Sequence, residues 1–189
     1  ATRRDDARLF LVSMALLASA GFLALHALAT PEAIVKEPNN GFVIATPIGL
    51  LLASGFAAAS AIDLRQARAG SILRRQALLR AALVVLLIGW AVASLAGLPL
   101  LDRPPEEEAP LLFRVLTPAG IGLYAFAAWR YGRLSRIRRR TLPLSVSVAF
   151  VLLAEALIAV AFARSWHASW WEWHVLMAIA FAIVLFAIR

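Results

Sequence analysis

The sequence predicts an all-α membrane protein: a single domain over residues 1–189, built as a bundle of six transmembrane helices with cytoplasmic N- and C-termini. Apolar side chains make up 62% of the chain, whereas a soluble domain contains about 45–50%. Six apolar runs are long enough to cross a bilayer, which requires roughly 20 residues per helix. The alternation at period 2 that marks a membrane barrel is absent, so helices must satisfy the backbone in lipid.

Each apolar run is assigned to one span, and the connections between the runs contain most of the charged residues. The first run is about twice as long as the apolar part of a secretory signal, so we expect it to be a retained helix. The spans are expected near residues 9–29, 42–62, 78–98, 111–131, 142–163 and 171–188.

The second and fourth runs share the pattern F-x-(V/I)-x-T-P-x-G, which begins at Phe42 and again at Phe113. This similarity suggests that spans one–two and three–four are copies of one hairpin; two independent proline bends are the alternative. Pro47 and Pro118 fall near the start of their helices, where a proline bends the axis and leaves a carbonyl without its helical donor. A small cavity near these bends is expected if the repeat is real.

The orientation follows from the arginines, which favour the cytoplasmic side of a membrane protein. Most of the nineteen basic residues lie at the N-terminus, in the second-to-third connection or in the fourth-to-fifth connection. The connections on the other side include the acidic run at residues 106–108. The net charge of +8 therefore reflects membrane topology, with contact to anionic lipid as a secondary role of the arginines. We expect no nucleic-acid partner.

The sequence gives no sign of catalysis within these residues. Cysteine is absent, which excludes thiolate metal sites and cysteine nucleophiles. No HExxH motif, nucleophile elbow or phosphate-binding loop is present. We therefore expect the chain not to be an enzyme, although a fused cytoplasmic enzyme outside these residues is compatible with it.

The stretch RSWHASWWEWHVLM, residues 164–177, lies where the chain enters the sixth span. Its tryptophans are typical of the belt that membrane proteins place at the headgroup level. His174 lies a few residues inside this span, and His26 lies near the outer end of the first. At 1.5 Å per residue, both are expected roughly 5–8 Å below the outer interface.

Glu155 is the only ionisable residue near the middle of a span, and a carboxylate in lipid should face the interior and have a partner. We predict a transition-metal site of His26, Glu155 and His174, since two imidazoles and a carboxylate suit Zn, Cu or Fe. His167 is a further candidate ligand if it lies on a turn. A purely structural polar cluster is one alternative, and haem held by the two imidazoles is another.

Two segments, HALATPEAIVKEPNNGFVIATP and SWHASWWEWHVLM, together with the six-span plan, resemble the membrane modules that precede cytoplasmic signalling domains in actinobacterial proteins. Membrane-bound class III adenylate cyclases are the best-known hosts of such modules. The resemblance implies a sensory or anchor module that relays a rearrangement of its helices to a cytoplasmic output domain, and the chain would be an excised membrane part. It also implies a homodimer formed through a C-terminal cytoplasmic region, in the inner or plasma membrane.

Two other functions remain open at the level of the sequence. A haem-binding membrane redox protein would use His26 and His174 as axial ligands. A small transporter would need polar residues along a path through the bundle, and Glu155 is among the few that the spans contain.

Overall fold

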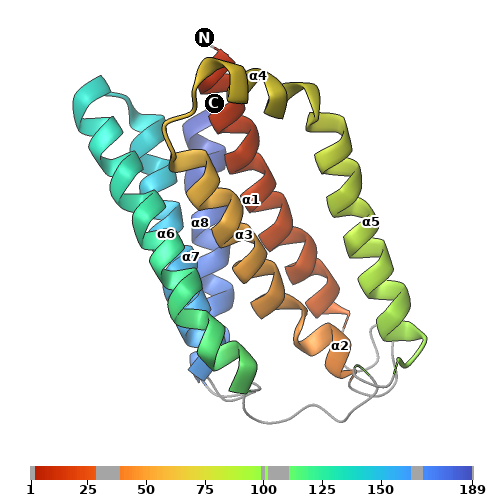
Figure 1. Ribbon diagram of the computed structural model, residues 1–189. Helices are drawn as coiled ribbons and strands as arrows, with labels where there is room; N and C mark the ends of the chain where they lie inside the picture. The colour runs from red at the N-terminus through yellow and green to blue at the C-terminus, as the bar shows by residue number, and fades with distance from the viewer. Residues whose placement is uncertain (1–2, 29–38, 99–100, 102–110, 163–167, 189) are drawn as a thin grey trace. The chain divides into compact units, whose positions relative to one another are not determined.

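The structure is a computed structural model that describes residues 3–28, 39–98, 101, 111–162 and 168–188. These residues are helical almost throughout and contain no strand (Figure 1). Six helices among them are long and apolar enough to cross a membrane, which confirms the predicted all-α, six-span class. The chain divides into two compact units, Ala1–Ala53 with Leu64–Glu107 and Ser54–Asp63 with Glu108–Arg189.

The first unit contains α1 (Arg3–Ala27), α2 (Asn40–Val43), the start of α3 (Ala45–Ala61), α4 (Gln66–Arg74) and α5 (Gln76–Leu95). Helix α1 packs against α2, α4 and α5. Its buried side chains recur every three or four residues, so one face of the helix is turned to its neighbours. These residues are Ala7, Leu11, Met14, Ala15, Ala18 and Phe22, among others.

Helix α3 begins in close contact with α1 at Gly49. A Cβ atom built on Gly49 would overlap the Cβ of Phe22 and lie 3.2 Å from the backbone oxygen of Ala18. The absence of a side chain at Gly49 therefore allows the two backbones to approach closely, as small residues do between membrane helices.

Two hydrogen bonds attach α5 to the α2 segment. The Trp90 indole Nε1 donates to the carbonyl oxygen of Gly41 at 2.8 Å. The Asn39 side-chain amide donates to the carbonyl oxygen of Ser94, also at 2.8 Å. The Asn39 side-chain oxygen in turn accepts from the Phe42 amide and caps α2.

The second unit contains the end of α3 with α6 (Leu111–Arg138), α7 (Thr141–Phe162) and α8 (Ala168–Ile188). Helix α7 packs against both α6 and α8, and these three helices form the green-to-blue part of Figure 1. The buried face of α7 again repeats every three or four residues and consists of Val146, Ala149, Phe150, Leu153, Ala156, Leu157 and Ala161.

The two proline segments that share a sequence pattern are both helical but differ locally. The first is interrupted at Ile44, and Pro47 then lies in the first turn of α3, where a proline is tolerated. The second is continuous, with Pro118 inside α6. The Thr117 hydroxyl beside this proline donates to the carbonyl oxygen of Phe113 at 2.7 Å.

Candidate functional site

His26 lies in the last turn of α1, beside the interruption between α2 and α3. Its Nδ1 atom is 3.3 Å from the carbonyl oxygens of both Phe42 and Val43. A carbonyl oxygen can only accept, so the ring nitrogen is the donor. Pro47 has no amide hydrogen and cannot donate to Val43 four residues before it, and His26 supplies the donor that the proline lacks.

His174 lies in the second turn of α8, within a cluster of tryptophans. Its Nδ1 atom donates to the carbonyl oxygen of Trp170 at 2.8 Å. The imidazole stacks on the Trp173 ring with centroids 3.5 Å apart and planes 25° apart, and it lies 4.3 Å from the Trp170 ring. These contacts fix the orientation of the ring.

Both described histidines therefore share one protonation pattern in their neutral form. With the proton on Nδ1 and given to a carbonyl, the lone pair is on Nε2. Histidines that ligate metals almost always donate their second ring nitrogen in this way. The arrangement suits an imidazole that binds a metal ion through Nε2.

Glu155 is placed differently from the sequence-based expectation. It lies on the face of α7 opposite the buried stripe, between the exposed Val151 and Ile158, and is itself exposed. A carboxyl group in the middle of an apolar span still needs a partner, because an isolated charge in lipid is costly. The described residues give its carboxylate no hydrogen bond or ion pair.

The structure places the predicted ligands in separate units and does not describe all of them. His26 belongs to the first unit, whereas Glu155 and His174 belong to the second. His167 lies outside the described residues. Among the residues that are described, no three His, Asp or Glu side chains are grouped so as to hold a metal ion.

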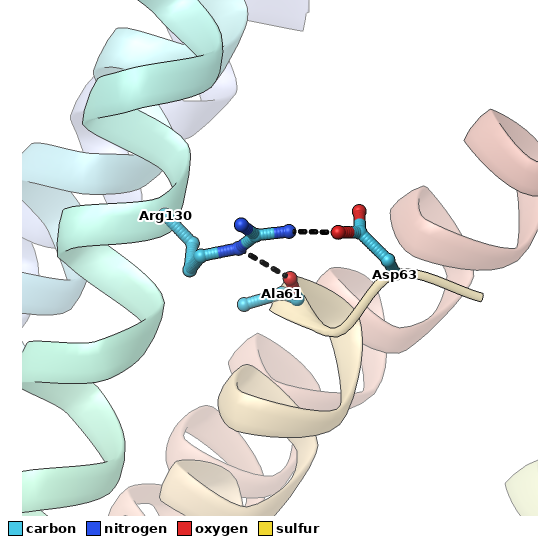
Figure 2. A network of polar contacts seen from close by, with 3 residues as sticks. All are labelled: Ala61, Asp63 and Arg130. Atoms are coloured by element: carbon cyan, nitrogen blue, oxygen red, sulfur yellow. Dashed lines mark hydrogen bonds and ion pairs between the residues drawn. The ribbon is translucent and has the colours of Figure 1, made fainter.

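A polar cluster between the end of α3 and α6 was not predicted. The Arg130 guanidinium pairs with the Asp63 carboxylate at 2.5 Å and donates to the carbonyl oxygen of Ala61 at 3.3 Å (Figure 2). At the next residue of α6, the buried Tyr131 hydroxyl lies 3.1 Å from the Ser60 hydroxyl. Asp63 is the one acidic residue in the arginine-rich connection at residues 62–80. This isolated acid among arginines is the sequence signal that could have indicated an ion pair.

Comparison with protein-family models, with curated proteins and with solved structures found no match to this chain.

Proposed function

We propose that this chain is a membrane sensory and anchor module that binds a metal ion or small ligand through histidines near the outer ends of α1 and α8. Binding would be relayed by the helices to a cytoplasmic output domain, as the resemblance to signalling membrane modules implies. The proposal includes cytoplasmic termini, a location in the inner or plasma membrane, and a homodimer formed through a C-terminal cytoplasmic region.

One observation carries the proposal: His26 and His174 each donate Nδ1–H to a backbone carbonyl. This hydrogen bond fixes the tautomer and increases the basicity of Nε2, which is what a metal-binding imidazole requires. Neutral Nε2 atoms suit Zn, Cu or Fe better than Mg or Ca, which prefer oxygen ligands.

The position of each histidine gives a route for a signal. His26 contacts the α2–α3 interruption, so a ligand that favours one orientation of its ring also favours one arrangement of that joint. His174 lies near the start of α8, which continues as an unbroken helix to Ile188. A ligand shifts such an equilibrium only by binding one arrangement more tightly than the other.

The test is the metal content of protein purified with an affinity tag that contains no histidine. The wild type should retain a transition-metal ion, and the variants His26→Gln and His174→Gln are each expected to lower the metal content. Gln keeps a polar side chain, and an unchanged thermal melting profile would show that each variant is folded.

Three results would overturn the proposal. The first is wild-type protein that takes up no stoichiometric metal when supplied with Zn, Cu or Fe. The second is full metal retention in both folded variants. The third is a Soret absorption band in the purified protein, which would favour the haem-binding redox function instead.

A further inference from the structure

A groove of about 670 Å³ lies on the surface of the second unit, between α6 and α7. Its α6 side is one face of the helix, because the residues recur at intervals of three or four. The lining comprises Ala125, Ala128, Trp129, Gly132, Arg133 and Arg136 of α6, with Ser147 and Val151 of α7.

The floor of the groove is made by small residues. The Ser147 hydroxyl donates to the carbonyl oxygen of Ala128 at 2.7 Å and so turns away from the opening. A Cβ atom at Gly132 would lie 3.2 Å from the Ser147 oxygen, so the glycine lets the two helices meet closely beneath the groove. Ala125 and Val151 extend the apolar surface toward the middle of both spans.

The groove is charged at one end only. Arg133 and Arg136 line it in the last turns of α6, and both are exposed. The Arg133 guanidinium lies 6.0 Å from the centre of the Trp129 ring, within the range of a cation–π interaction. Arg130, by contrast, is paired with Asp63. The described residues provide no acidic partner for Arg133 or Arg136.

We propose that this groove binds one anionic phospholipid, with its phosphate on Arg133 and Arg136 and an acyl chain on the apolar floor. Eleven residues separate Arg136 from Ala125, which is about 16 Å along a helix, so the surface extends from the headgroup level well into the hydrocarbon. Guanidinium groups match phosphate oxygens in geometry and charge. Trp129 lies beside them, as expected for a residue at the lipid interface.

The two-part character of the groove distinguishes a lipid from a free phosphate. A soluble phosphate uses only the arginines and gains nothing from the surface near Ala125 and Val151. A phospholipid uses both parts, and a zwitterionic lipid with the same acyl chains uses the arginines less well. Each juxtamembrane arginine is worth about 1 kcal/mol toward an anionic lipid, which is about fivefold in affinity.

The test measures binding of dioleoyl phosphatidylglycerol to the detergent-solubilised chain by native mass spectrometry, with dioleoyl phosphatidylcholine as the reference lipid. We expect preferential binding of phosphatidylglycerol. Arg133→Gln and Arg136→Gln should each weaken it about fivefold, and the double variant about 25-fold. The double variant Arg133→Lys with Arg136→Lys should keep most of the preference, because both positive charges remain.

Two further variants separate a defined site from diffuse attraction. Arg140→Gln removes an exposed charge outside the groove, near the same end of α6, and should change affinity by less than about twofold. Ala125→Leu fills the groove at an exposed position and should weaken binding of the lipid without affecting binding of glycerol phosphate.

The proposal fails if Arg140→Gln weakens binding as much as Arg133→Gln, since the attraction would then be general to the arginine-rich end. It also fails if phosphatidylcholine binds equally well. Glycerol phosphate binding as tightly as the lipid, with no effect of Ala125→Leu, would identify a phosphate site and refute a lipid site.

Discussion

Gly49 of α3 offers the sharpest test of the packing in the first unit. In the variant Gly49→Ala, the new Cβ would overlap the Cβ of Phe22 and lie 3.2 Å from the backbone oxygen of Ala18. Neither atom belongs to the far end of a flexible side chain, so rotation of a side chain cannot relieve the contact. The backbones of α1 and α3 must move apart.

The size of the effect follows from two opposing contributions. Overpacking of a close contact costs about 1–3 kcal/mol, and the rigid partners of Gly49 place it in the upper part of this range. Alanine in place of glycine gains up to about 1 kcal/mol of helix propensity. We therefore expect Gly49→Ala to lower the free energy of unfolding by roughly 1–2 kcal/mol.

Gly55 supplies the matched control within the same helix. A Cβ atom at Gly55 would have no other atom within 4 Å, so Gly55→Ala should show only the gain in propensity. The two variants should differ by roughly 2–3 kcal/mol in reversible unfolding by SDS in mixed micelles, followed by tryptophan fluorescence. Equal stability of the two variants would refute the close contact between α1 and α3.

Three further predictions concern the second unit and the topology. Tyr131→Phe should lower the unfolding free energy by about 0.6–1.5 kcal/mol in the same assay, because it removes the buried hydroxyl that is hydrogen-bonded to Ser60. An unchanged unfolding free energy would contradict that hydrogen bond. Asp63→Asn should lower the unfolding free energy by at most about 1 kcal/mol, and by less at high salt, because the Asp63 carboxylate that pairs with Arg130 is largely exposed to solvent. A salt-independent loss of several kcal/mol would contradict a solvent-screened ion pair. Arg140→Cys, the sole cysteine in the chain, should react with an impermeant maleimide in cells only after the membrane is opened, and labelling of intact cells would reverse the predicted orientation.

The number and class of the helices could be predicted from the sequence because apolar length is a direct consequence of bilayer thickness. The ends of the helices could not. Helix α1 begins at Arg3, six residues before the apolar run near residue 9, and α6 continues to Arg138. Apolar residues mark the part of a helix that lipid surrounds, whereas the helical hydrogen bonds continue into the polar residues beyond.

For the candidate site, the types of residue could be predicted from the sequence, but the contacts of His26 and the exposure of Glu155 depend on how the helices pack. Pro47 predicted a carbonyl without a helical donor. That His26 donates to this carbonyl could not be predicted, because the contact depends on how α1 meets the α2–α3 joint. Glu155 was expected to face the interior on the ground of cost alone. The helical repeat places Glu155 on the face opposite the buried Leu153 and Leu157, so the periodicity of the buried residues was the better guide to its position.

The unexpected exposure of Glu155 also changes how a metal site would have to be completed. The imidazoles of His26 and His174 are each oriented by a hydrogen bond to a backbone carbonyl, whereas the described residues provide no such partner for the exposed Glu155 carboxylate. The predicted ligand set is therefore best tested one side chain at a time, with His26 and His174 first.

Binding of a metal ion by imidazole side chains can be measured by X-ray absorption at the metal edge of the protein as purified. We expect the multiple-scattering signature of imidazole nitrogen at about 2.0–2.1 Å from a bound Zn, with its intensity reduced in His174→Gln. A spectrum explained by oxygen ligands alone, or one that the His174→Gln substitution leaves unchanged, would contradict it.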